Sequence, residues 1–310
     1  MQRLTVVDGR SRFRSFAVLA FATFGLAACG DARVTPTRTA SHQASTDAPV
    51  ATPTLPKDVP GLVAALSDPS SEVRRLAAEA LGKAGNPAAA LPLLKELDDK
   101  DVYARKAAAE ALGLALEKAP QGAQGRTEAV DALIRLLGDP DYGVRYSSVE
   151  GLSHLSSRRA VPALVTALEK DTDENVRGHA AWALGQVGDP AAVEPLIAAL
   201  RNGRADSWKV SYALGELGGP AATDVLMTGL RKKKYEMVSG AAEFFAKRND
   251  PELQTLLLEM LRKTNDGAVA DAFLLSTDPA LVAAGRAFWG ENRRTTTMDE
   301  QGRVTREQVR

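Results

Sequence analysis

Four side chains of this 310-residue chain could bind a metal or act as a nucleophile. They are the single cysteine, Cys29, and three histidines, His42, His154 and His179. Neither His154 nor His179 has a second histidine or a cysteine at the spacing that places two ligands together on one helix. We therefore expect no catalytic residues, no metal site and no cofactor, and we expect that the chain is not an enzyme.

Two apolar series within residues 173–200, each with a step of four residues, predict a pair of short amphipathic helices. Gly188 stands where the first helix would end in a left-handed residue. Asp189 and Pro190 then supply an N-cap oxygen and a first helical turn for the second. The two series are Val176, Ala180 and Leu184, followed by Ala192, Leu196 and Leu200.

Looser copies of this helix pair recur on both sides of it. The position of Leu184 corresponds in turn to Leu81, Leu112, Leu152, Leu184, Leu214, Phe245 and Phe273. A pair of helices cannot bury its apolar stripe alone, but a stack of pairs can. The sequence therefore predicts an all-α protein, an α-solenoid of about seven helix pairs. Residues 59–66 would be a lone second helix at its start, and residues 118–127 an inserted loop in the second copy.

These copies resemble HEAT repeats of the short type named after phycobilisome lyases. The resemblance rests on the segments SSEVRRLAAEALGKAGNP, YGVRYSSVEGL and ENVRGHAAWALGQVGDPAAVEPLIAAL, and it covers about residues 58–290. It implies that arginines early in each first helix bond acids and carbonyls of the adjacent copy. The metal-binding HEAT enzymes similar to deoxyhypusine hydroxylase use His-Glu pairs, which this chain lacks.

The first 28 residues have the pattern of an export signal, with early arginines followed by an apolar run from Phe16 to Ala28. The sequence from Leu26 to Cys29 resembles a bacterial lipobox. That resemblance implies cleavage before Cys29 and a lipid on its sulfur, which would anchor the protein to a membrane. The alternative is an ordinary secretory signal with an unrelated thiol. The choice between inner and outer membrane stays open.

Residues 29–57 are rich in Pro, Thr, Ser and Ala and have no apolar period, which predicts a disordered tether. Residues 291–310 form a polar tail, expected to lack regular structure apart from a short helix near its end. The chain has 39 basic and 39 acidic residues, and this balance gives no indication of nucleic-acid binding.

Aromatic residues gather on the first helices of three consecutive copies. Two aligned positions of the first helices are four residues apart and so lie on one helix face. In the other copies these positions are mostly charged, but in these three copies they include aromatic residues. The residues are Tyr146, Trp182, Trp208 and Tyr212. They could anchor a partner protein. The other interpretation is that these rings cover the grooves between neighbouring first helices.

A second feature is the charge of the turns that follow the second helices. Early turns are acidic, whereas later ones carry Arg201, Arg231, Lys232, Lys233, Lys234, Arg262 and Lys263. We call these later residues the basic edge. It could bind an acidic protein or an anionic lipid, or it could be solvated charge that is favourable at helix C-termini.

The sequence thus predicts a lipid-anchored scaffold in the bacterial envelope, on its periplasmic or outer-membrane side, that binds an unknown protein partner. One alternative is a divergent lyase-like or metal-dependent HEAT-repeat enzyme. The other is a structural envelope component without a specific partner.

Overall fold

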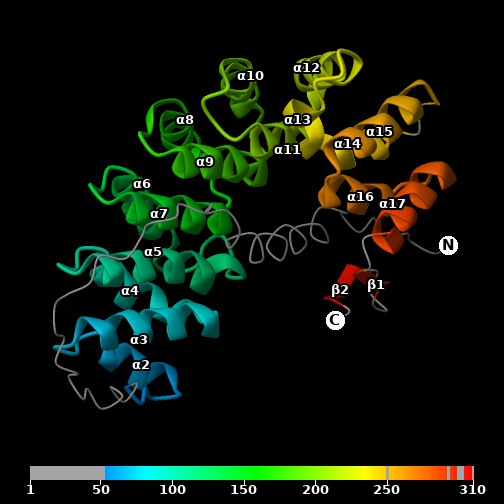
Figure 1. Ribbon diagram of the computed structural model, residues 1–310. Coiled ribbons are helices and arrows are strands. Elements are labelled where there is room, and N and C mark those ends of the chain that lie inside the picture. The colour runs from blue at the N-terminus through cyan, green and yellow to red at the C-terminus, as the bar shows by residue number, and fades with distance from the viewer. Residues whose placement is uncertain (1–52, 249–250, 292–293, 299–303, 309–310) are drawn as a thin grey trace, which may run out of the picture. The chain divides into compact units, whose positions relative to one another are not determined.

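The computed structural model describes residues 53–248, 251–291, 294–298 and 304–308, and in this part the helices stack in pairs (Figure 1). The stack begins with α2 (Val59–Ala65), which stands alone and is capped by the side chain of Asp58. This helix is the lone second helix that the sequence predicted. Cys29, where the sequence predicts a lipid, and most of the predicted tether lie outside the described residues.

Seven helix pairs follow α2 within the described residues, so the predicted all-α solenoid is confirmed. The first helices are α3 (Ser71–Ala84), α5 (Val102–Glu117), α7 (Tyr142–Leu155), α9 (Glu174–Val187), α11 (Ser207–Leu217), a broken sixth helix, and α16 (Gly267–Leu274). The second helices are α4 (Ala90–Glu96), α6 (Arg126–Leu136), α8 (Val161–Lys170), α10 (Val193–Asn202), α12 (Gly219–Arg231), α15 (Pro251–Thr264) and α17 (Pro279–Glu291). Short 3-10 turns lead into three of these: η2 (Pro87–Ala89), η3 (Arg158–Ala160) and η4 (Pro190–Ala192).

The core runs through the stack along the aligned apolar positions. The side chains at Leu81, Leu112, Leu152, Leu184, Leu214, Phe245 and Phe273 are all fully buried. The predicted turn chemistry is also present: Gly188 ends α9 with a φ of 70°, and the Asp189 carboxylate accepts a hydrogen bond from the Ala191 amide at 2.9 Å. Repeat spacing and capping together therefore determine each helix pair.

Neighbouring first helices touch along their backbones. A β-carbon at Gly82 would lie 2.7 Å from the Ala111 Cα, and one at Gly185 would lie 2.8 Å from the Ala213 Cα. Larger side chains cannot fit at such distances, so these glycines allow the close approach. Each directly follows an aligned leucine, but the spacing of apolar residues gives no sign of their role. As a result, side chains from adjacent first helices share one continuous surface.

The sixth first helix is broken into α13 (Tyr235–Val238), the 3-10 turn η5 (Ser239–Ala241) and α14 (Ala242–Ala246). The break presses Gly240 against α11, because a β-carbon there would lie 1.9 Å from the Trp208 carbonyl oxygen. No other residue type could occupy this position without moving α11. The copies therefore become irregular from this point onward.

The C-terminal tail differs from its prediction. Instead of a short helix, it contains two paired strands, β1 (Arg294–Met298) and β2 (Val304–Gln308). The three consecutive threonines of β1 and the Val-Thr pair of β2 are β-branched, which suits extended backbone. Among the described helices, none combines the length and apolar character that a bilayer crossing requires.

Candidate functional site

The arginines near the starts of the first helices form a ladder along one edge of the stack. The Arg74 guanidinium donates to both carboxylate oxygens of Asp99, at 2.6 and 2.9 Å, and to the Asp68 carbonyl at 2.9 Å. Both side chains are about nine-tenths buried. Such a two-pronged, charge-assisted contact is among the strongest polar interactions in proteins. It ties the turn after α4 to the start of α3.

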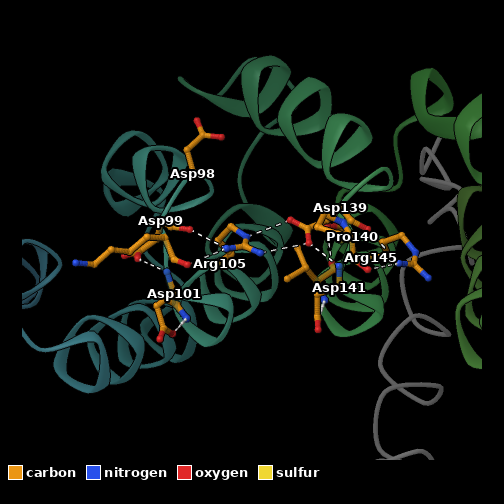
Figure 2. Close-up of polar contacts among 12 residues, drawn as sticks. Asp98, Asp99, Asp101, Arg105, Asp139, Pro140, Asp141 and Arg145 are labelled. Carbon is orange, nitrogen blue, oxygen red and sulfur yellow. Dashed lines mark hydrogen bonds and ion pairs between the residues drawn. The ribbon is translucent and has the colours of Figure 1, made fainter.

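The same contact repeats twice further along. Arg105 donates to Asp139 at 3.1 and 3.3 Å, and Arg145 donates to Asp171 at 2.8 and 2.9 Å. Figure 2 shows the first of these, with Asp99 and Asp139 also accepting from backbone amides of their own turns. We call these three ion pairs the Arg–Asp ladder. It confirms the role that the HEAT resemblance implied for these arginines.

Three acids of the early turns, Asp99, Asp139 and Asp171, belong to the ladder, whereas Asp101, Asp141 and Asp173 cap the first helices that follow. The Arg74 contact lowers the pKa of Asp99, which keeps this carboxylate ionised and bound in place. Asp98 instead points away from the ladder in Figure 2 and pairs with Arg135 at 3.1 Å, where both side chains are exposed. The acidic turns are therefore mainly structural.

The ladder ends at Arg177. Asn202 makes the turn that an aspartate makes in the earlier copies, because its side-chain oxygen accepts from the Arg204 amide at 3.0 Å. Arg177 donates to the Arg204 carbonyl at 2.7 Å rather than to a carboxylate. The described residues after this point contain no further rung.

Sequence reasoning missed Arg126, which ends the inserted loop. Its buried guanidinium donates to the carbonyls of Leu116 at 2.5 Å, Ala119 at 3.3 Å and Leu155 at 2.9 Å. These carbonyls lie at or just beyond the C-terminal ends of α5 and α7, where a positive charge is favourable. Burial lowers the pKa of Arg126. The inserted loop thus delivers a cap for two first helices.

The aromatic residues lie on three consecutive first helices, as predicted. Tyr146 is on α7, Trp182 on α9, and Trp208 and Tyr212 on α11. Trp182 is only 7% exposed. The prediction that its ring contacts a partner protein is therefore corrected: Trp182 is a packing residue. Trp208 and Tyr212 are half-buried and stack in parallel, with ring centroids 5.6 Å apart. The surface formed by Tyr146, Trp208, Tyr212 and the glutamates beside them is called the first-helix face below.

His179 fills the space between two of these rings. Its centroid lies 4.4 Å from that of Tyr146 and 5.1 Å from that of Trp182. It is 5% exposed, and neither ring nitrogen has a hydrogen-bond partner within the described structure. Burial, with the nearby charge of Lys209, lowers the pKa of His179 to about 3. The ring is therefore neutral at physiological pH and packs as part of the floor beneath the first-helix face.

Carboxylates flank both tyrosines of this face. Burial and the charges of Glu150 and Glu110 raise the pKa of Tyr146 to about 12. Tyr212 is similar: burial and Glu216 raise its pKa, while its hydroxyl accepts a hydrogen bond from Gln186 at 3.4 Å. Each tyrosine therefore lies close to negative charge on its own helix and on a neighbouring one.

The other repeat histidine, His154, lies on α7 beside Glu117, with Nδ1 3.6 Å from a carboxylate oxygen. This contact lowers the pKa of Glu117. Across the described residues, no three His, Cys, Asp or Glu side chains gather as metal ligands would. His154 thus has a carboxylate as its neighbour, and His179 has two aromatic rings.

The basic edge lies at and just beyond the C-terminal ends of α10, α12 and α15, and its residues are exposed. Lys233 pairs with Glu259 at 2.8 Å and adopts a left-handed backbone conformation with a φ of 54°. The structure therefore brings these residues to the same edge as the ladder. Binding by the basic edge stays a prediction.

Comparison with known proteins identifies the repeats. The family model described as HEAT repeats matches residues 59–124, 91–169 and 130–209. The chain is similar to Epoxyqueuosine reductase of Bacillus subtilis (strain 168), with 34% identity over 67 residues, which cover 22% of this chain and 17% of the relative. It is also similar to the Bilin biosynthesis protein PecE of Nostoc sp. (strain PCC 7120), with 35% identity over 68 residues, covering 22% of this chain and 27% of the relative. The chain thus spans under a third of the length of either relative.

Among solved structures, the complex of CpcE and CpcF of phycocyanin lyase from Nostoc sp. PCC7120 is similar to the chain. The two share 19% identity, with a TM-score of 0.49, over 82% of this chain and 99% of that one.

These relatives correct one expectation from the sequence. We expected that the chain is not an enzyme because its histidines lack ligand spacing. Two proteins that share its repeats are nevertheless named as a reductase and as a bilin biosynthesis protein. Repeats of this kind therefore occur in proteins with enzymatic roles, and the spacing of histidines does not exclude such a role here.

Proposed function

We propose that this HEAT-like repeat protein binds another protein through its first-helix face. The observation that supports this most is the stacked pair of Trp208 and Tyr212, half-buried beside glutamates on a surface shared by adjacent first helices. Large, rigid aromatic side chains at partly exposed positions are the residues that most often anchor protein interfaces.

The proposed binding can be tested by crosslinking in intact cells, followed by affinity purification and mass spectrometry. The test variant carries Trp208→Ala and Tyr212→Ala. A matched control carries Tyr103→Ala and Tyr142→Ala, which removes two rings that are 65% and 58% exposed elsewhere on the chain. We expect a partner that the wild type and the control capture and that the test variant loses. A partner captured equally by all three proteins, or no partner at all, would exclude the proposal.

We also propose that the protein is anchored to a bacterial membrane through a lipid on Cys29. The support is the pattern of residues 1–29, with early arginines, an apolar run and the only cysteine directly after Ala28. A polar tether of roughly 30 Å root-mean-square reach would then separate the solenoid from the bilayer. Labelling cells with a palmitate analogue tests the anchor. Label and membrane association should disappear in Cys29→Ser, and persistent label would contradict it.

A second candidate function is participation in an enzyme that handles a bilin. It rests on the similarity of a 68-residue segment to the Bilin biosynthesis protein PecE. If the chain takes part in such chemistry, the purified protein should bind a bilin. Titration with phycocyanobilin should then shift the visible absorption band of the pigment, and both should co-elute on gel filtration. An unchanged spectrum with separate elution would remove this candidate.

A further inference from the structure

The first-helix face contains two similar groups of side chains, one on each side of α9. In the first group, Tyr146 of α7 lies beside Glu150, one turn along the same helix, and beside Glu110 of α5. Neither glutamate forms an ion pair within 4 Å among the described residues. Burial, followed by repulsion from Glu110, raises the pKa of Glu150. Lys106 and His154 oppose this effect without reversing it.

The second group repeats the pattern on α11. Tyr212 lies beside Glu216, one turn along the same helix, and beside Glu243 of α14. Glu243 pairs with Lys247 at 2.5 Å, whereas Glu216 is exposed and has no such partner in the described structure. Partial desolvation by neighbouring side chains and the charge of Glu243 raise the pKa of Glu216 despite Lys247. We call the two groups the tyrosine–glutamate clusters.

Two carboxylates beside the ring of a tyrosine form an environment that favours a cation. A guanidinium fits best, because it can bond a carboxylate with two parallel N–H groups while its plane stacks on an aromatic ring. A bound cation would also relieve the repulsion within each cluster. Between the clusters, the buried rings of His179 and Trp182 form an aromatic floor, and the mostly buried Lys209 lies against Gly178 of α9 with its ammonium 3.8 Å from Asp206.

The separation of the clusters sets the length of chain that could occupy both. One cluster lies across α5 and α7 and the other across α11 and α14, so about three helix spacings of 8–10 Å separate them. This gives roughly 25 Å, which an extended peptide covers in about eight residues.

We propose that the first-helix face binds an extended basic segment of the partner protein, with one arginine in each tyrosine–glutamate cluster. This inference rests on the proposed protein-binding function and adds the chemistry of the partner. The support is charge complementarity: Glu110, Glu150 and Glu216 form no ion pair among the described residues, and half-buried tyrosine rings lie beside them.

The test uses the purified full chain and fluorescein-labelled peptides of twelve residues in a Gly/Ser/Ala background. One peptide has two arginines eight residues apart, one has them four apart, one has lysines at the wider spacing, and one has glutamates there. Fluorescence anisotropy should show the widely spaced arginine peptide binding at least tenfold more tightly than the glutamate peptide. Lysines and the shorter spacing should each weaken binding, as should high salt.

The decisive variant is Glu150→Gln with Glu216→Gln, and its matched control is Glu169→Gln with Glu194→Gln. Each double variant removes two negative charges. The control residues Glu169 and Glu194 are exposed on second helices, away from the first-helix face. The decisive variant should lose at least tenfold in affinity while its melting temperature stays equal to or above that of the wild type. The control should bind as the wild type does. This combination separates lost binding from lost folding.

Several results would overturn the inference. Equal binding of arginine and glutamate peptides would do so, as would equal loss in both glutamine variants. If the peptides fail to bind while the crosslinked partner still depends on Trp208 and Tyr212, the inference fails and the proposed function stands.

Discussion

The two halves of the solenoid are held together differently. From α3 to α9, buried Arg–Asp pairs join each copy to the next, and each first helix is continuous. From α11 onward, the described residues contain no rung of this ladder, and the sixth first helix breaks at Ser239–Ala241. Contacts such as the hydrogen bond from Trp289 Nε1 to Asp271, 3.0 Å long, fasten this second half instead. The comparison indicates that the ladder fixes the regular spacing of copies.

The first-helix face lies across the boundary between these halves. Its Tyr146 cluster is on the ladder half, and its Tyr212 cluster is on the irregular half. The Arg–Asp ladder therefore holds the copies on one side of the face, and no rung among the described residues holds them on the other side. If the ladder matters, breaking contacts in the two halves should cost different amounts of stability.

The largest effect is expected from breaking a rung. Arg145→Met should leave the Asp171 carboxylate buried without its partner and lower the free energy of unfolding by about 3–5 kcal/mol. The matched change in the second half is Lys233→Met, which breaks the exposed pair with Glu259 and should cost about 0–1 kcal/mol. Urea unfolding followed by circular dichroism measures both. Equal losses would show that the two kinds of pair do not differ.

Removing the buried cap at Arg126 should have the next largest effect. Arg126→Met would remove the guanidinium that donates to three carbonyls, two of them in buried contacts, which should cost about 2 kcal/mol. The same unfolding measurement applies, with the exposed Arg135→Met as a control. A loss no greater than that of the control would mean that water replaces the guanidinium.

A gain is expected from extending the ladder into the second half. Asn202→Asp would supply a carboxylate where the ladder ends, within the turn whose carbonyl already accepts from Arg177. The new pair should add about 1 kcal/mol to the free energy of unfolding. High salt should reduce this gain if it is electrostatic. A free energy of unfolding that is unchanged or lower would show that the chain follows a different path at this turn and does not accommodate a rung.

The smallest effect concerns the glutamate of the first cluster. The folded-state pKa of Glu150 is raised by burial and by Glu110, so its ionisation costs the folded state free energy. Glu150→Gln should therefore stabilise the protein at pH 7 by about 0.5 kcal/mol. The gain should fade as the pH falls through the folded-state pKa and vanish below the ordinary glutamate pKa of about 4.3. Urea midpoints at pH 7 and pH 4 test this sign, and a gain that grows at pH 4 would contradict it.

Much of the fold could be predicted because its signals are local in sequence. The step of four residues, the Gly188 C-cap and the Asp189 N-cap each act within one helix pair. The ladder followed from the resemblance to HEAT repeats. These features depend on spacing that a single sequence displays directly.

The remaining features depend on neighbours that the sequence does not display. Arg126 appeared to be part of a polar loop, yet it is buried against the ends of two helices. Trp182 aligns with the half-buried Glu79, Glu110 and Glu150 of earlier copies but is itself buried by the packing around α9. The break at Gly240 arises from the contact with α11, and only the folded chain shows it. The expectation that the chain is not an enzyme was also wrong. It rested on the absence of histidine pairs at metal-ligand spacing, and that absence says little about what a repeat surface can do.

The most direct test of protein binding by the first-helix face is site-specific photocrosslinking in living cells. A photoreactive amino acid would replace Gln186, a half-buried residue of α9 beside the Tyr212 hydroxyl, or Glu194, an exposed residue of the second helix α10. A discrete crosslinked partner from position 186 and none from position 194 is the result that we predict. Crosslinks from position 194 alone, or the same partner from both positions, would contradict the assignment of binding to the first-helix face.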